Sequence, residues 1–336
     1  MRKAVRNRIW IYGTIVTVVV GGYFYQPVRI DFFPKALPSP NPPVDPDSAE
    51  LFKKGARVMV VTAHPDDTEY YLSGFLLKLA KAGVKIDLVV CTDGDKGFYL
   101  WENAARNRAE RRSEQLAVAK RWNADAVEFL GFPDGRLHPN PDVIAAIHER
   151  ILKYKPAWLV AFDGDYPPHV SHGDHRSSGQ AALPAAAGTS VRWAMLFATR
   201  AGNYVTDVSD TEESARELLA IHASQFAGQK LDAVAATVMD QSSQDGDKAG
   251  FTYGIAFRCV RLEPPYKNWA ATVRLPPIWL SPLLVDRFGC LEWSGCFRKA
   301  IIQLIDGKGQ TIRGNGLFVA NIGSAACRLQ PRKAAS

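Results

Sequence analysis

Residues 57–69, RVMVVTAHPDDTE, contain the stretch that decides the fold. Their apolar, β-branched first half, residues 57–63, ends in a small residue, which is typical of a buried parallel strand. The polar segment from His64 to Glu69 follows at once. Residues 70–82 then show apolar positions at helical spacing, and Gly83 stands where a helix commonly ends. This pattern predicts a strand, a polar loop and a helix in succession.

The same alternation continues along the chain. Further strands are expected at 84–92, 127–132, 157–162 and 251–262, helices at 102–122, 141–153 and 211–222, and a Gly/Asp/Ser/Gln-rich loop at 240–250. Such alternation indicates an α/β fold with an open, mainly parallel (Rossmann-like) sheet flanked by helices. In sheets of this kind, ligands bind at the carboxyl ends of the strands.

Composition and charge narrow the class of protein. The 336 residues are 47% hydrophobic and 22% charged, as in a folded chain, which excludes disordered, collagen-like and coiled-coil proteins. The net charge is +7, but four of the positive charges precede residue 9, on Arg2, Lys3, Arg6 and Arg8. The remaining +3 is ordinary, so we expect no nucleic-acid partner.

The N-terminal region predicts a membrane anchor. Residues 9–28 carry no charge, and twenty helical residues span about 30 Å, the thickness of the hydrocarbon core. With the basic flank, residues 1–30 are expected to form a single-pass signal anchor in the inner (cytoplasmic) membrane, with the globular part on the periplasmic side. A cleaved signal peptide and a soluble, β-rich N-terminus are the alternatives. Residues 31–54 are proline-rich and read as a stiff linker.

The C-terminal part, residues 263–336, is expected to be a β-rich extension of unknown role. It contains hairpin turn signals at Asp306-Gly307 and Asn315-Gly316. Cys91 lies in an apolar run and reads as a buried thiol. In an oxidising compartment the remaining cysteines allow two disulfides in three connectivities; they are Cys259, Cys290, Cys296 and Cys327.

Two polar clusters follow predicted strands. Three carboxylates and an imidazole lie between His64 and Glu69, and the segment His172-Gly173-Asp174-His175 repeats the same residue types after the strand at 157–162. Carboxylates so close together repel unless a positive charge lies between them, and a divalent metal is the simplest such charge; a solvated acidic turn is the alternative. Two histidines and one carboxylate with open positions suit catalytic zinc or non-haem iron.

Six motifs in order carry a family resemblance, and they are AHPDDTE at 63–69, TDGDKG at 92–97, RRSEQLAVA at 111–119, GFPDGRL at 131–137, HGDHR at 172–176 and HASQF at 222–226. Together they resemble the PIG-L/LmbE family of zinc-dependent N-acetylglucosaminyl deacetylases. The segment GFTYGIAFR at 250–258 is similar to a further family block. The resemblance runs from about residue 57 to 260, so we place the deacetylase-like domain at 55–262.

The resemblance implies a role for particular residues. It assigns His64, Asp67 and His175 as ligands of one Zn²⁺ per chain, with other divalent metals as alternatives. It makes Asp66 the general base and His172 the general acid, with the tautomer and charge of His172 set by Asp174. The remaining implied residues are Arg111 and Asp134 against the sugar hydroxyls, and Glu69, Asp93, Tyr166, His222 and Gln225 lining the site.

The chain departs from the family pattern at three places. Thr68 stands where the family usually has Glu, and Glu69 follows one place later. Gly254-Ile255 replaces the usual Ala-Glu. Val170 stands where some members have a carbonyl-polarising tyrosine, so that role is vacant or falls to Tyr166.

The resemblance therefore leads us to expect a membrane-anchored deacetylase that acts on an N-acetylglucosamine-type sugar in a lipid-linked or polymeric glycan of the cell envelope. The alternatives are a catalytically inactive glycan-binding protein of the same fold and a non-haem iron oxygenase.

Overall fold

The computed structural model describes residues 28–30, 36–37, 42–97, 103–262, 304–305 and 311–312. The chain divides into two units, Met1–Pro264 and Pro265–Ser336. In the second unit, strands β10 (Leu304–Ile305) and β11 (Thr311–Ile312) pair antiparallel. They enclose the segment with the predicted Asp306-Gly307 turn, which itself lies outside the described residues.

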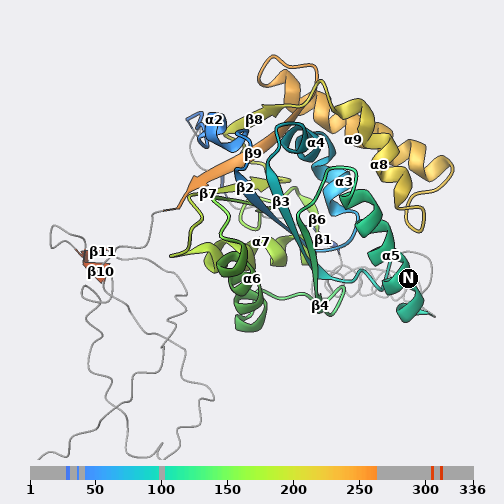
Figure 1. Ribbon diagram of the computed structural model, residues 1–336, viewed down its shortest axis with the longest axis horizontal. Coiled ribbons are helices and arrows are strands. Elements are labelled where there is room, and N and C mark those ends of the chain that lie inside the picture. Colours follow the sequence, from blue (N-terminus) through green and yellow to red (C-terminus); the bar gives the residue numbers. More distant parts are fainter. Residues whose placement is uncertain are drawn as a thin grey trace, which may run out of the picture. The chain divides into compact units, whose positions relative to one another are not determined.

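The first unit is built on a seven-stranded sheet with the order β4-β3-β2-β5-β7-β9-β8 (Figure 1). The bounds of its strands are β2 Arg57–Thr62, β3 Lys85–Thr92, β4 Ala126–Phe132, β5 Trp158–Phe162, β7 Trp193–Phe197, β8 Tyr204–Asp207 and β9 Gly254–Arg261. The five strands from β4 to β7 in this order are parallel, and β9 and β8 are antiparallel to their neighbours. The predicted mainly parallel α/β sheet is confirmed.

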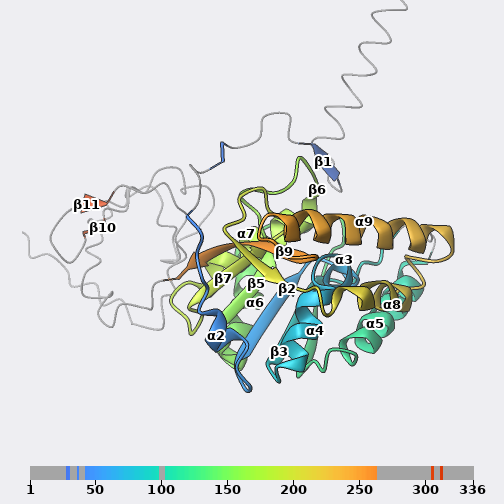
Figure 2. The same cartoon turned by 90° about the horizontal axis from the view of Figure 1, so that it is seen from above.

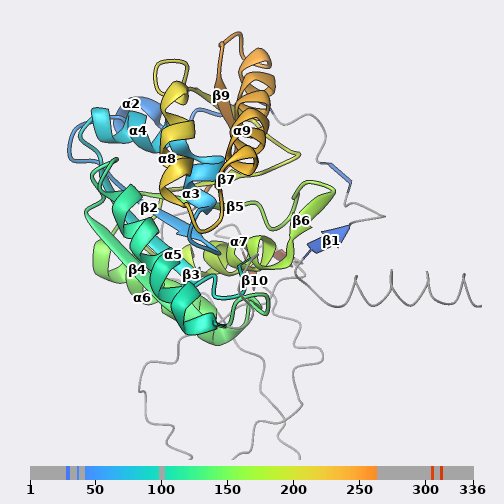
Figure 3. The ribbon, with the colours of Figure 1, turned by 90° about the vertical axis from the view of Figure 1, so that its right-hand side faces the viewer.

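Helices cover both faces of this sheet (Figures 2 and 3). Their bounds are α2 Ser48–Leu51, α3 Asp67–Tyr71, α4 Ser73–Lys81, α5 Ala104–Ala119, α6 Pro141–Tyr154, α7 Gly173–Ala186, α8 Ala215–Ile221 and α9 Gln229–Asp247, with a 3₁₀ turn η1 at Glu212–Ser214. Alternate residues of β2 face opposite layers, as the period of a strand requires. Val58 and Val60 pack with α4, whereas Met59 and Val61 pack with α6 and α7.

The predicted loop at 240–250 was wrong, because helix α9 continues through it to Asp247. Four of the polar residues that suggested a loop are exposed, and they are Asp240, Gln241, Gln244 and Asp247. Its buried side carries Ala235, Val238, Ser242 and Gly246, a helical spacing that composition alone does not reveal. A Cβ at Gly246 would lie 3.0 Å from the backbone nitrogen of Gly254, so the missing side chain lets α9 approach β9.

The predicted helix at 70–82 is two helices. Helix α3 ends at Tyr71 and α4 begins at Ser73, because Leu72 between them has a non-helical conformation (φ −133°, ψ 5°). Leu72 itself is fully buried. The break lets α3 carry Asp67 at the site while α4 packs along the sheet.

The predicted anchor, residues 9–28, lies outside the described residues except at its end, where Val28–Ile30 form strand β1. This strand pairs antiparallel with β6 (Val170–His172). Among the helices that the structure describes, none combines the length and the apolar character that crossing a bilayer requires.

Part of the predicted linker packs on the domain. The Val44 amide donates to the Asn203 carbonyl (3.0 Å), and Nε1 of Trp158 donates to the carbonyl of Pro46 (2.8 Å). Leu51 in α2 is fully buried. The linker segment from Val44 to Leu51 therefore packs on the domain, ahead of the predicted domain start at 55.

Cys91 and Cys259 are buried free thiols. Burial raises the pKa of Cys259 to about 12, so this thiol is unreactive at neutral pH. The other three cysteines lie outside the described residues.

Helix α7 approaches the end of β5 closely at Gly179. A Cβ at this position would lie 2.8 Å from the carbonyl carbon of Phe162 and 3.0 Å from the Gly164 nitrogen, both backbone atoms. Gly179→Ala should therefore lower the free energy of unfolding by about 1–3 kcal/mol in urea denaturation. Gly202→Ala is the control, because its Cβ would make only ordinary contacts. Equal stability of the two variants would contradict this packing.

Candidate active site and metal centre

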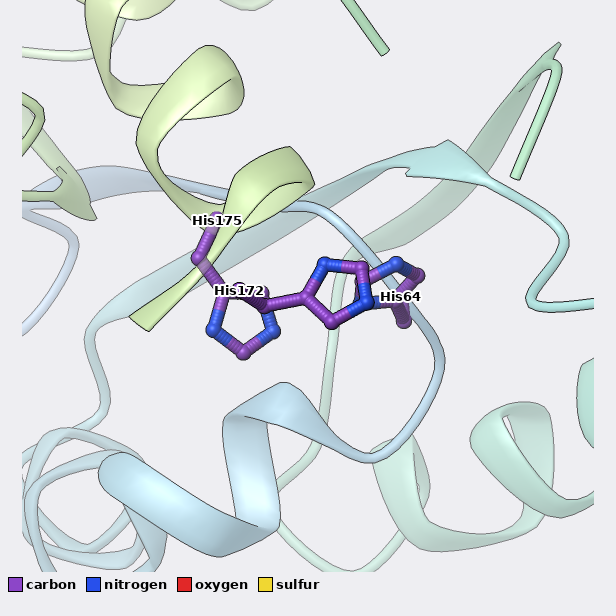
Figure 4. Close-up of side chains that lie close together, drawn as sticks. All are labelled: His64, His172 and His175. Atoms are coloured by element: carbon purple, nitrogen blue, oxygen red, sulfur yellow. The ribbon is translucent and has the colours of Figure 1, made fainter. Parts of the chain in front are cut away.

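Three histidines meet where β2 and β5 end. His64 follows β2, while His172 and His175 follow β5 through β6 and the start of α7. Since β2 and β5 are parallel neighbours, their carboxyl ends lie side by side. Figure 4 shows the three imidazoles gathered together, with ring centroids of His64 and His172 4.7 Å apart and those of His64 and His175 5.2 Å apart. One ring nitrogen of each histidine lies within 4.8 Å of one ring nitrogen of the other two.

The carboxylate of Asp67 ties this cluster to the turn after β2. Its Oδ2 accepts hydrogen bonds from the backbone nitrogens of Ala63 (2.9 Å) and His64 (2.8 Å). Its Oδ1 lies 3.0 Å from Nε2 of His175 and 3.8 Å from Nδ1 of His64. Burial alone would raise the pKa of Asp67, but His175 and His64 hold it well below its usual range. Asp67 is therefore an anion between two imidazoles.

These distances fit a metal ion held by His64, Asp67 and His175. Two ligand atoms of a tetrahedral zinc with bonds of about 2.0–2.1 Å lie about 3.4 Å apart. The separations of 3.0 and 3.8 Å from Asp67 lie on either side of that value. Imidazole nitrogen and carboxylate oxygen are also donors that zinc prefers.

The second nitrogen of His64 has the partners of a metal ligand. Its Nε2 lies 3.2 Å from Oδ1 of Asp134 and 3.2 Å from Oδ2 of Asp174. Burial lowers the pKa of His64, but these two carboxylates and Asp67 together raise it well above its usual value. Metal-binding histidines commonly donate their other N–H to a carboxylate in this way, which leaves Nδ1 for the metal.

His64, Asp134 and Asp174 form a second group of potential ligands. We favour the set containing Asp67, because the oxygens of Asp174 already accept hydrogen bonds from the backbone nitrogens of Gly135 (2.6 Å) and Leu137 (3.0 Å).

Asp66 is held in place by two side chains of α5, Gln115 and Arg111. Its backbone is left-handed (φ 99°), which is strained for a residue with a side chain. Its N–H donates to Oε1 of Gln115 (2.9 Å), and its Oδ2 accepts from Nη2 of Arg111 (2.9 Å). Burial raises the pKa of Asp66 and Arg111 opposes that rise. A carboxylate with a raised pKa beside a metal site is suited to accept a proton.

His172 is the N-cap of α7, and its Nδ1 accepts a hydrogen bond from the backbone N–H of Asp174 (3.2 Å). The neutral ring therefore carries its proton on Nε2. Burial, together with His64 and His175, lowers the pKa of His172 to about 3. The sequence predicted that Asp174 sets this tautomer; its backbone does so, whereas its carboxylate contacts His64.

Arg111 and Asp134, expected against the sugar, both border the cluster. Arg111 is 4% exposed and donates to the carbonyls of Gly94 (2.7 Å) and Pro65 (2.5 Å) besides Asp66. Its Nε is buried and has no partner in the part of the chain that the structure describes. Asp134 accepts from the backbone of Lys96 (2.8 Å) and contacts His64.

Glu69 and His222 form a fully buried pair behind Asp66. Oε2 of Glu69 lies 2.8 Å from Nε2 of His222 and accepts from the hydroxyl of Thr68 (2.7 Å). Gln115 donates to both Thr68 and Glu69 (3.1 and 3.3 Å) while its oxygen holds the backbone of Asp66. The sequence placed Glu69 and His222 near the site but missed Gln115. Its spacing of four from Arg111 on one helix was the available signal.

The other expected site-lining residues contact side chains outside the histidine cluster. Asp93 pairs with Arg108 (3.1 Å) and Arg112 (2.7 Å) on α5. The guanidinium of Arg258 lies over the ring of Tyr166, 5.0 Å from its centroid. Nε2 of Gln225 donates to the hydroxyl of Ser224.

A tyrosine other than Tyr166 contacts the cluster. Tyr71 packs edge-on against His175, with ring centroids 5.8 Å apart. Phe162 stacks on the same imidazole at 4.2 Å. Val170, which stands where some members of the family have a carbonyl-polarising tyrosine, lies on β6 and is 59% exposed. Sequence reasoning missed Tyr71, because it lay within the predicted helix at 70–82.

Comparisons with known proteins agree on the class of this domain. Residues 59–186 match the family described as PIG-L: GlcNAc-PI de-N-acetylase. The chain is 27% identical over 195 residues to a diacetylchitobiose deacetylase of Thermococcus kodakarensis, covering 53% of this chain and 73% of the relative. It is 30% identical to a 1D-myo-inositol 2-acetamido-2-deoxy-alpha-D-glucopyranoside deacetylase of Actinosynnema mirum, and the match covers 48% of this chain and 64% of the relative.

Solved structures show the same relationship. An N,N'-diacetylchitobiose deacetylase from Pyrococcus horikoshii superposes with a TM-score of 0.59 at 25% identity, over 66% of this chain and 92% of that one. The hydratase GalB from Pseudomonas putida shares the fold alone, with a TM-score of 0.53 at 17% identity, over 63% and 99% of the two chains. Residues 59–186 therefore match the PIG-L family, and the solved structures show the same fold over about two thirds of this chain.

The Glu69–His222 pair predicts a pH-dependent stability. Burial lowers the pKa of His222, but Glu69 raises it above its usual value overall. The folded state therefore holds the His222 proton more tightly than the unfolded state, so this stabilisation is complete below about pH 6.5 and declines as pH rises above it. Urea denaturation at pH 6 and pH 9 should show a larger loss of stability in wild type than in His222→Gln. Parallel losses in the two proteins would contradict the pairing, and Glu69→Gln should behave like His222→Gln.

Proposed function

We propose that the protein is a metal-dependent deacetylase that hydrolyses the N-acetyl group of an N-acetylglucosamine-type sugar. The observation that carries the proposal is the arrangement of His64, Asp67 and His175 at ligand spacing, with the next carboxylate, Asp66, held by Arg111. The similarity to named deacetylases supports the same reaction.

The residues of the site divide the work of amide hydrolysis. His64, Asp67 and His175 would hold a zinc ion, which when bound supplies a Lewis acid and lowers the pKa of water. Asp66 accepts the proton of the attacking water, and Arg111 keeps its carboxylate in place. The neutral ring of His172 donates its Nε2–H to the acetyl oxygen as that oxygen gains charge, but its lowered pKa makes it a poor proton donor to the leaving nitrogen. The proton that Asp66 took from water is therefore returned by Asp66 to the leaving nitrogen, so the general-acid role expected of His172 falls to Asp66 and neither residue changes its protonation over the cycle.

Two substitutions separate metal binding from proton transfer. Asp66→Asn should lower acetate release from N,N'-diacetylchitobiose by at least 100-fold while bound zinc stays at the wild-type level, because Asp66 is not a ligand in this scheme. His175→Ala should lose both the bound zinc and the acetate release, because His175 is a proposed ligand. Acetate is measured enzymatically and zinc by elemental analysis of the purified protein. Asp142→Asn, an exposed carboxylate on α6, is the matched control. Retained activity in Asp66→Asn would refute the mechanism.

We further propose that residues 9–28 anchor the enzyme in the inner membrane, with the domain on its periplasmic side and a lipid-linked or polymeric envelope glycan as substrate. The uncharged stretch of twenty residues and the basic flank before it support this placement.

Fractionation tests the anchor. The full chain should sediment with membranes, resist extraction at high salt and dissolve in detergent, because an inserted helix is released only when the bilayer is dispersed. A chain that begins at residue 36 keeps the packed segment from Val44 onward and should remain in the supernatant. Mass spectrometry of the membrane form should show the N-terminal residues intact. A processed N-terminus would establish a cleaved signal peptide instead.

A further inference from the structure

Strand β1 (Val28–Ile30) pairs with the strand that carries His172. The two strands run antiparallel, with Val28 opposite His172, Arg29 opposite Ser171 and Ile30 opposite Val170. Figures 2 and 3 show β1 beside β6, and this pair forms a sheet of its own. The Cα atoms of opposite residues in such a pair lie about 5 Å apart, so Val28 is a direct backbone neighbour of His172.

Strand β6 (Val170–His172) depends on β1 for its hydrogen-bonded ladder. Among the strands that the structure describes, β6 pairs with β1 alone. Its three residues are exposed or half-buried, so packing in the core does little to fix them. A short strand with few buried contacts and no ladder has a poorly defined position, because water can replace its backbone partners. The pairing with β1 therefore limits where β6 can lie.

The position of β6 matters because His172 is its last residue. On its other side, His172 is held by α7, where its Nδ1 accepts from the backbone N–H of Asp174 (3.2 Å). Its ring lies edge-on to that of His64, with centroids 4.7 Å apart. A hydrogen bond from Nε2–H to the acetyl oxygen weakens steeply when the donor is displaced or misaligned. The backbone on both sides of His172 thus sets the quality of that bond.

This pairing belongs to the N-terminal segment of the chain. Residues 28–30 lie outside the range 59–186 that matches the PIG-L family. Val28 and Ile30 are β-branched, which favours an extended backbone. Val28 is also the last residue of the uncharged stretch that we propose as the anchor. The segment that would tether the enzyme therefore continues directly into a strand beside the site.

We propose that β1 is a positioning strand for His172, which holds the Nε2–H of this imidazole in line with the acetyl oxygen by pairing with β6. The inference rests on the proposed deacetylase function, in which that N–H stabilises the oxygen as it gains charge. The proposed ligands are held by other elements, since His64 and Asp67 follow β2 and His175 lies within α7. Loss of the pairing should therefore slow the chemical step, while substrate binding and bound zinc stay unchanged.

Paired proline substitutions in the full chain, purified in detergent, test the inference. Arg29→Pro combined with Ile30→Pro removes a ladder donor in either hydrogen-bonding pattern, because opposite pairs alternate between bonded and non-bonded along the strands. We expect kcat for acetate release from N,N'-diacetylchitobiose to fall at least about tenfold with KM and bound zinc unchanged, because a displaced donor costs transition-state stabilisation. The matched control is Ala36→Pro combined with Leu37→Pro, two exposed residues of the same segment, and it should keep the wild-type kcat.

A His172→Gln background separates positioning from a general loss of structure. If β1 acts through His172, the proline pair at 29 and 30 should not lower kcat further in His172→Gln, because the group that it positions is already absent. An equal loss in both backgrounds would assign β1 a purely structural role. A wild-type kcat in the proline variant, or a loss of its bound zinc, would also overturn the inference.

Histidine NMR distinguishes failure of the positioning strand from failure of the deacetylase function. If wild type releases no acetate, the ring signal of His172 in protein with isotope-labelled histidine still reports on its surroundings, and its absence from His172→Gln identifies it. A shift of this signal in Arg29→Pro with Ile30→Pro, but not in the control at 36 and 37, supports the positioning strand even then. An unchanged signal overturns it.

Discussion

The site depends on one buried anion, the carboxylate of Asp67. One of its oxygens closes the turn after β2 by accepting two backbone N–H groups, and the other faces His64 and His175. A carboxylate without such partners is costly to bury, so its burial requires the turn and both imidazoles to be in place together. The same side chain thus joins the end of β2, the start of α3 and the first turn of α7. A shift in any of these elements changes the ligand geometry.

A second buried network holds the neighbouring carboxylate in position. Asp66 has a strained backbone. The strain persists because Gln115 of α5 accepts a hydrogen bond from its N–H and Arg111 of α5 donates one to its carboxylate. Gln115 is in turn fixed by the buried pair of Glu69 and His222. Two adjacent aspartates can therefore take different roles. Asp67 is stabilised by His64 and His175, whereas Asp66 is stabilised by Arg111 of α5.

Sequence reasoning reached four of the five parallel strands, namely β2, β3, β4 and β5, and the identity of the clustered residues, because buried strands are short apolar runs and the polar residues follow directly. It missed the fifth parallel strand, β7. It failed at 240–250, where polar composition hid a helix whose buried face is made of small residues. It also could not foresee that Arg111 pairs with Asp66, that the carboxylate of Asp174 serves His64, or that Tyr71 contacts His175. Those contacts join segments far apart in the chain, and local pattern does not encode their distances.

The change of strand direction between β7 and β9 separates two kinds of residue. The proposed ligands and the base come from segments after the parallel strands β2 and β5, whereas α9 packs on the antiparallel strands β8 and β9. Mutations on the exposed side of α9 can therefore accumulate without moving the proposed ligands. Within such a fold, the outer surface beside the antiparallel strands is free to diverge between lineages while the reaction itself is inherited unchanged.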